Sequence, residues 1–99
     1  MSRSIIWSPR SRRDYIKLLD YLLEEWGHGS VKKFNALLVK SLDHISENPE
    51  LYQAANKRSK IRRCVISKQT SLYYRVKKQE IELITLFDTR QHPKKKKLK

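Results

Sequence analysis

Cysteine, glycine and proline are scarce in this chain of 99 residues, which has one, two and three of them. The single cysteine, Cys64, excludes an internal disulfide and favours a reducing compartment. No histidine, cysteine or carboxylate spacing typical of a metal site occurs, so we expect neither a metal nor another cofactor.

Long hydrophobic runs are also missing. No stretch approaches the roughly 20 apolar residues that a membrane-spanning helix needs. The opening segment, MSRSIIWSPR, has only three consecutive apolar residues, too few for the apolar part of a secretion signal. We therefore expect a cytoplasmic protein.

Acidic residues are few, because 10 Asp and Glu stand against 23 Lys and Arg, for a formal charge of +13. Like charges on a small domain repel one another, so the composition predicts a polyanionic or acidic partner. Nucleic acid, an acidic protein and an anionic membrane surface all meet that description. The length allows one domain, with roughly two-thirds of the unfolded surface buried.

The first half of the chain predicts a strand and two helices. The strand covers residues 4–7, and Ser8 and Pro9 then fit the cap and first position of a helix. Apolar residues at three- and four-residue spacing follow as far as Trp26, and the glycine after it ends this helix. We expect residues 27–30 to form a turn, with the serine at its end capping a second helix that stops before residues 48–49.

The second half predicts three strands, over residues 61–66, 72–76 and 81–87, separated by polar turns. The order is β-α-α-β-β-β. The sequence therefore predicts an α+β domain over residues 1–93, in which an N-terminal helical hairpin packs on one side of a mainly antiparallel sheet. We expect residues 94–99, KKKKLK near the end of the chain, to be a mobile basic tail.

Three segments, in this order, cover nearly the whole chain: IIWSPRSRRDYIKLLDYL, IRRCVISKQTSLYYRV and IELITLFDTRQHP. With these segments the chain resembles the RelE/ParE superfamily of bacterial type II toxin–antitoxin toxins. The middle segment looks like the family's second and third strands, and the last looks like its fourth strand followed by a turn with a functional arginine. The resemblance implies a small basic toxin that its own antitoxin holds inactive with an acidic segment.

The superfamily contains two kinds of toxin, and a shared fold does not choose between them. ParE-like members inhibit DNA gyrase and are not nucleases by themselves, whereas RelE-like members are ribosome-dependent endoribonucleases that cut mRNA. RelE-like enzymes have a basic residue at the start of the third strand, where this chain has Ser71. We therefore favour ParE-like inhibition by occlusion of a macromolecular target. The alternative is a RelE-like nuclease, and a third interpretation is a simple nucleic-acid-binding module.

If the protein is a nuclease, the catalytic candidates are Arg75, Arg90 and His92. Metal-free RNA cleavage needs groups that move protons and stabilise a phosphorane. An imidazole titrates near neutrality, but no orienting carboxylate is identifiable beside His92, so a solvated histidine is the preferred interpretation. Asp88 and Arg90 are two positions apart at a strand end, which places both side chains on one face. Arg90 is then either held by Asp88 or presented to an anion.

Basic residues gather around the second predicted strand, and an aromatic residue on the third faces away from the core. This pattern predicts a surface for a polyanionic target, and a solvated charge run with a packed tyrosine is the alternative. The residues that we expect to bind the target or nucleic acid are Arg58, Lys60, Arg62, Arg63, Tyr73, Arg75 and Arg90.

The remaining expectations concern the core and the partners. Trp7 and Trp26 are predicted core residues, and Cys64 is a small packing residue rather than a nucleophile. The expected partners are a cognate acidic antitoxin, in a toxin–antitoxin hetero-oligomer, and either DNA gyrase or the ribosome with its mRNA. We expect no membrane partner.

Overall fold

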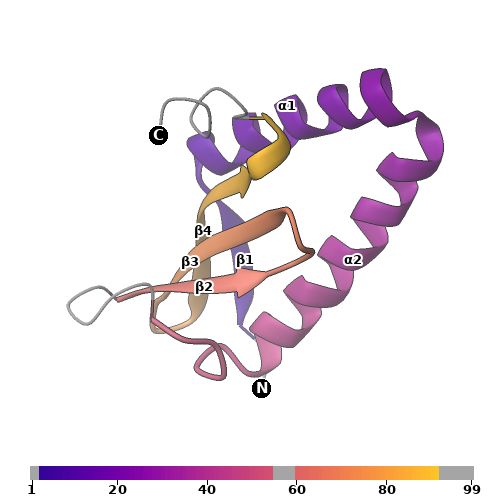
Figure 1. Ribbon diagram of the computed structural model, residues 1–99. Coiled ribbons are helices and arrows are strands. Elements are labelled where there is room, and N and C mark those ends of the chain that lie inside the picture. The colour runs from indigo at the N-terminus through magenta and orange to yellow at the C-terminus, as the bar shows by residue number, and fades with distance from the viewer. Residues whose placement is uncertain (1–2, 55–59, 92–99) are drawn as a thin grey trace, which may run out of the picture.

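Two helices and four strands follow one another in the predicted order (Figure 1). The computed structural model describes residues 3–54 and 60–91. Arg58, His92 and residues 94–99 lie outside them. The elements are β1 (Ser4–Trp7), α1 (Pro9–Trp26), α2 (His28–Glu47), β2 (Ile61–Val65), β3 (Thr70–Val76), β4 (Glu80–Asp88) and the short 3₁₀ helix η1 (Thr89–Gln91).

The four strands form one mixed sheet in the order β1-β4-β3-β2. β1 pairs with β4 in parallel, and the other two pairs are antiparallel. One bulge interrupts the β3–β4 pairing: Tyr74 pairs with Leu83 and Tyr73 pairs with Thr85, so β4 has one extra residue at this point. The predicted α+β fold with a mainly antiparallel sheet is confirmed.

The helices begin and end for local reasons. The Ser8 hydroxyl accepts a hydrogen bond from the backbone N–H of Ser11 at 3.0 Å, which caps α1 before Pro9. Gly27 has a φ of 87°, a left-handed value that favours glycine, and it alone separates the helices. The predicted turn over residues 27–30 is therefore wrong. Ser30 lies inside α2, where its hydroxyl donates to the carbonyls of Gly27 and Leu22.

Both helices cover the same side of the sheet, and from Gly27 they diverge as the two arms of an open V (Figure 1). The core lies between this V and the sheet, with side chains from α1, α2 and the three C-terminal strands. The buried hydrophobic residues are Leu18, Leu22, Phe34, Leu38, Ile45, Cys64, Ile66, Leu72, Tyr74, Ile81, Leu83 and Leu86.

The two tryptophans have different environments. Trp7 packs against the core, and the centroids of the Trp7 and Tyr15 rings are 5.2 Å apart. Trp26 is 61% exposed, so the prediction that it belongs to the core is wrong. Leu22, one turn earlier on α1, is still buried. The apolar pattern of α1 therefore extends one turn beyond the part of the helix that is buried against the rest of the domain.

The end of β4 has a helix beside it instead of a strand. β1 stops at Trp7, and the backbone N–H of Ser8 still donates to the carbonyl of Leu83. Beyond that point the Asp14 carboxylate of α1 accepts hydrogen bonds from the Thr85 hydroxyl and from the backbone N–H of Leu86. A side chain of α1 therefore takes the place that a longer β1 would fill.

Candidate functional site

The sheet has an open face, which we define by Arg63, Ser71, Tyr73 and Arg75. Side chains alternate along a strand, and the buried Leu72 and Tyr74 point towards the helices. Their neighbours on β3 therefore point the other way. Arg63 of β2 is opposite Tyr73 of β3 in the β2–β3 ladder. The pairing therefore places predicted target-binding residues from two strands side by side.

The charges on the open face are only partly neutralised. Glu82 lies 4.0 Å from the Arg75 guanidinium and 3.5 Å from the Lys77 ammonium, so one carboxylate serves two cations. Arg63 donates from Nε to the Ser71 hydroxyl at 3.2 Å. Within the described residues, Arg63 has no ion pair. The open face is thus cationic, and its charges are at the surface.

Arg62 does not lie on this face. Arg62 alternates with Arg63, and its guanidinium donates to the carbonyls of Tyr52 at 2.5 Å and Glu50 at 3.4 Å. These bonds hold the segment before the undescribed residues 55–59 against β2. Lys60 is exposed immediately before β2. Arg62 therefore has a structural role in this arrangement.

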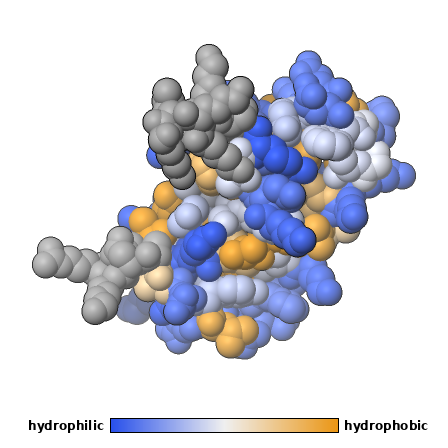
Figure 2. Space-filling view, viewed as in Figure 1, coloured by the Kyte–Doolittle hydropathy of each residue, from blue (hydrophilic) through white to orange (hydrophobic). Residues whose placement is uncertain are grey.

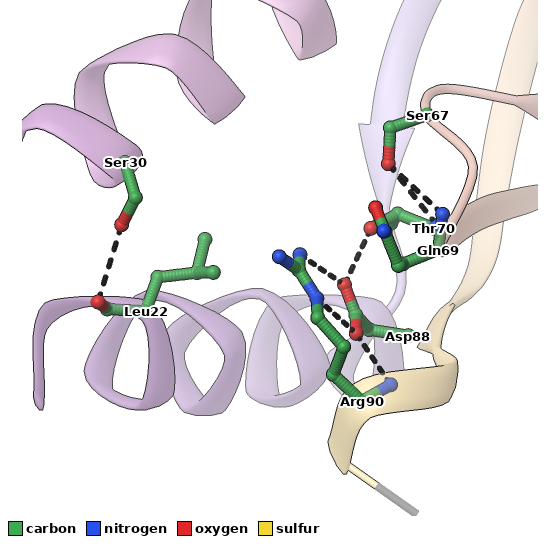
Figure 3. Close-up of polar contacts among 7 residues, drawn as sticks. All are labelled: Leu22, Ser30, Ser67, Gln69, Thr70, Asp88 and Arg90. Carbon is green, nitrogen blue, oxygen red and sulfur yellow. Dashed lines mark hydrogen bonds and ion pairs between the residues drawn. The ribbon is translucent and has the colours of Figure 1, made fainter. Parts of the chain in front are cut away.

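Arg90 lies on the other side of the sheet, in η1, where Asp88 holds it (Figure 3). The Asp88 side chain is fully buried. Arg90 donates to it three times: from Nε at 3.1 Å, from Nη2 at 2.8 Å and from its backbone N–H at 2.8 Å. The Thr70 hydroxyl adds a bond of 2.5 Å. Of the two interpretations of Arg90, the structure contains the pair with Asp88.

This network changes the ionisation of both partners. Burial alone would raise the pKa of Asp88, but the hydrogen bonds from Arg90 and Thr70 outweigh it and hold the pKa below its usual range. The bond to Asp88 raises the pKa of Arg90. Asp88 is therefore a carboxylate at neutral pH, and its charge fixes the direction of the guanidinium.

That direction is towards a cavity of about 280 Å³ between the V of the helices, the β2–β3 turn and η1. Figure 3 shows the Arg90 guanidinium between Leu22 of α1 on one side and Gln69 of the β2–β3 turn and Thr70 of β3 on the other. In the view of Figure 2, hydrophobic residues show between hydrophilic ones in the hollow between α2 and the sheet. The lining includes the cations Lys33 and Lys68, which were not among the sequence candidates.

The candidates therefore separate into two groups. Arg63, Tyr73 and Arg75 share the open face, whereas Arg90 lies with the cavity on the side of the helices. The three residues that the structure adds are Lys33, Lys68 and Thr70. They come from α2, from the β2–β3 turn and from the first position of β3, so no spacing in the sequence indicates that they meet. The buried acid at the end of an apolar run was the signal for Asp88.

Two features are absent from residues 3–54 and 60–91. No three side chains of His, Cys, Asp or Glu come together there as metal ligands. In this part of the chain, neither helix combines the length and the apolar composition of a membrane span.

Residues 5–93 match the family model described as the ParE toxin of the type II toxin–antitoxin system, parDE. The chain belongs to this family. The match begins at the second residue of β1 and includes all the later helices and strands, and it agrees with the resemblance that the three sequence segments indicated. No curated protein sequence matches the chain.

Solved structures with the same fold come from both branches of the superfamily. A chain of the chromosomal ParDE toxin–antitoxin system from P. aeruginosa has a TM-score of 0.72 and 16% identity, over 88% of this chain and 96% of that one. A chain of the RelBE2 toxin–antitoxin complex from Mycobacterium tuberculosis has a TM-score of 0.63 and 14% identity, over 89% and 99%. The YoeB dimer from Staphylococcus aureus has a TM-score of 0.63 and 18% identity, over 88% and 97%. At these identities the likeness shows the fold.

Proposed function

We propose that this protein is a cytoplasmic growth-inhibiting toxin that acts as ParE-like toxins do, by binding a macromolecular target such as DNA gyrase and stopping its cycle. Arg63, Tyr73 and Arg75 make the polar contacts from the open face. The Arg63 and Arg75 side chains are at the surface, and Arg75 shares the single Glu82 carboxylate with Lys77, so little must be broken before a large anionic surface can bind.

The observation that carries this choice is the environment of Ser71. The hydroxyl already accepts a bond from Arg63, and a serine supplies no fixed charge for a phosphorane. Among the described residues, the open face has no histidine to act as a general base. An open face with no fixed cation at position 71 and no histidine among the residues that define it supports target binding rather than RNA cleavage.

The proposal includes a cognate acidic antitoxin, in a hetero-oligomer with the toxin. Two observations support it. The formal charge of +13 calls for an anionic partner, and four of the similar structures are titled as toxin–antitoxin systems or complexes. An apolar groove between the helices, lined in part by Trp7, Tyr15, Val39 and Leu42, is a surface that a partner segment can cover.

Gyrase supercoiling with the purified chain tests the proposal. We expect inhibition by the wild type and a loss of at least about tenfold in Arg63→Ala/Arg75→Ala, because each arginine gives up a charge-assisted contact. Lys17→Ala/Lys40→Ala removes the same charge from exposed helix positions and should inhibit like the wild type. An equal loss of inhibition in both double variants would show that inhibition depends on net charge and not on the open face.

The RelE-like nuclease is the second candidate, because RelBE2 and YoeB share the fold and because Arg75, Arg90 and His92 remain its candidate residues. A cell-free translation reaction separates the two. Intact mRNA with blocked supercoiling supports the inhibitor. Cleavage at codon positions that Arg90→Ala abolishes supports the nuclease.

A further inference from the structure

The cavity beside Arg90 has a charged rim. Lys33 comes from α2, Lys68 from the β2–β3 turn and Arg90 from η1. Both lysines are exposed, and neither side chain has an ion pair or hydrogen bond within residues 3–54 and 60–91. Arg90 uses Nε and Nη2 on Asp88, which leaves Nη1 without a partner in the same residues. Among the described residues, no acidic side chain lines the cavity. The rim thus offers three cations to an anion.

The floor of the same cavity is apolar. Leu22 and Phe34 are buried at its base, and Leu37 at its edge is 36% exposed. An apolar floor beneath a ring of cations fits a ligand that has an aliphatic group and an anionic group close together. Asp88 also holds one of the three cations, Arg90, in a fixed position at the rim.

The size of the cavity favours a protein segment over a nucleotide. Its volume of about 280 Å³ is at or below the roughly 300–1,000 Å³ of small-molecule sites. Single-stranded nucleic acid binds on accessible aromatic faces, whereas the aromatic ring here, Phe34, is buried in the floor. One aliphatic side chain with a neighbouring carboxylate matches both the floor and the rim.

We propose that this cavity anchors an acidic segment of a partner protein, with a leucine-type side chain on Leu22, Phe34 and Leu37 and a carboxylate among Lys33, Lys68 and Arg90. The inference rests on the proposed function for the identity of that partner, the antitoxin. It separates the anchor from the open face, so neutralisation and target binding use different sides of the sheet. Asp88 is a positioning residue for the anchor, since it acts through Arg90.

The test uses the full chain labelled with ¹⁵N and two blocked peptides, N-acetyl-Leu-Glu-Glu-amide and N-acetyl-Leu-Gln-Gln-amide. We expect the acidic peptide to shift the amide signals of Lys33, Leu37, Gln69 and Arg90, and to bind roughly tenfold more tightly than its uncharged match. Equal binding of the two peptides, or no shift at these amides, overturns the proposal. Inorganic phosphate that shifts the same amides more than the acidic peptide also overturns it, in favour of a phosphate site.

Matched variants separate the cavity from overall charge. Lys33→Gln/Lys68→Gln should weaken the acidic peptide at least about tenfold. Lys32→Gln/Lys40→Gln removes the same charge from exposed positions of α2 outside the cavity and should bind like the wild type. Equal weakening in both variants contradicts a specific anchor.

Growth arrest by the same variants distinguishes this inference from the proposed function. Lys33→Gln/Lys68→Gln that still arrests growth supports a cavity separate from the target surface. Loss of arrest with an unchanged circular dichroism spectrum overturns that separation. A wild-type chain that does not arrest growth contradicts the proposed function, and the peptide titration then still decides the chemistry of the cavity.

Discussion

The carboxylates on the two faces of the sheet differ in burial and in how completely they are paired. On the face beneath the helices, Asp88 is 1% exposed and accepts four hydrogen bonds from Arg90 and Thr70. On the open face, Glu82 lies 3.5 and 4.0 Å from Lys77 and Arg75, and all three side chains contact solvent. A buried carboxylate is tolerable only when it is fully paired, and that pairing fixes Arg90. Exposed pairs are loose, so Arg75 can exchange its partner for another anion.

The largest effect should come from the core side of the comparison. Leu72 is fully buried and its neighbour Tyr73 faces away from the helices. Leu72→Ala should lower the free energy of unfolding by about 2–5 kcal/mol, because it leaves a cavity. Tyr73→Ala should cost less than half as much. Urea denaturation measures both, and equal losses would contradict the assignment of the two faces.

The next effect concerns the carboxylates themselves. Asp88→Asn should lower the free energy of unfolding by about 1–3 kcal/mol, because Arg90 loses its charged partner and at least one buried bond is broken. Glu82→Gln should change it by about 0–1 kcal/mol, as is usual for exposed pairs. Denaturation at low and high salt checks the difference. A larger loss in Glu82→Gln would show that the open face depends on its ion pairs.

A single hydroxyl sharpens the comparison further. Tyr74 is buried, and its hydroxyl donates to the carbonyl of Pro49 at 2.6 Å. Burial raises the pKa of this phenol, so it stays a donor at neutral pH. Tyr74→Phe should cost about 0.5–1.5 kcal/mol of stability. Tyr73→Phe on the open face is the matched control and should be close to neutral.

The smallest effect appears in acid. The lowered pKa of Asp88 means that its contribution to stability is fully present above the unfolded value of about 3.9 and is lost as the pH falls through the folded value. The difference in denaturation midpoint between the wild type and Asp88→Asn should therefore be largest near neutrality and shrink below about pH 4. The difference for Tyr74→Phe should stay constant over this range, and parallel narrowing of both would contradict the role of Asp88.

The sequence was sufficient for the fold because local and periodic signals agreed. The cap at Ser8, the stop at Gly27 and the alternation around Leu72 each predicted an element that the structure contains. Trp26 was assigned wrongly, because spacing reports which side of a helix is apolar and not how far the sheet extends beneath it. The predicted connection between the helices, residues 27–30, was too long, because the prediction placed the cap of α2 at Ser30. In the structure its hydroxyl donates to backbone carbonyls from within that helix.

The candidate site was less predictable, since it depends on which strand neighbours which. Arg63 and Tyr73 become partners only through the β2–β3 register. Arg62 has the same charge as Arg63, yet alternation directs it to the carbonyls of the preceding segment. Lys33 and Lys68 meet only because the β2–β3 turn lies beside α2. Charge composition indicates a polyanion-binding protein, but it cannot assign each cation to a side of the sheet.

The hydrogen bonds of Asp14 to the end of β4 have a consequence for self-association. An unpaired strand edge is a template on which another chain can form a ladder. Here a helix carboxylate occupies the donors of Thr85 and Leu86, so this stretch of the rim is closed to an incoming strand. The edge strands of the sheet are β1, which has four residues, and β2, which has five. We therefore expect little tendency of this cationic protein to form fibrils by strand pairing at its sheet edges.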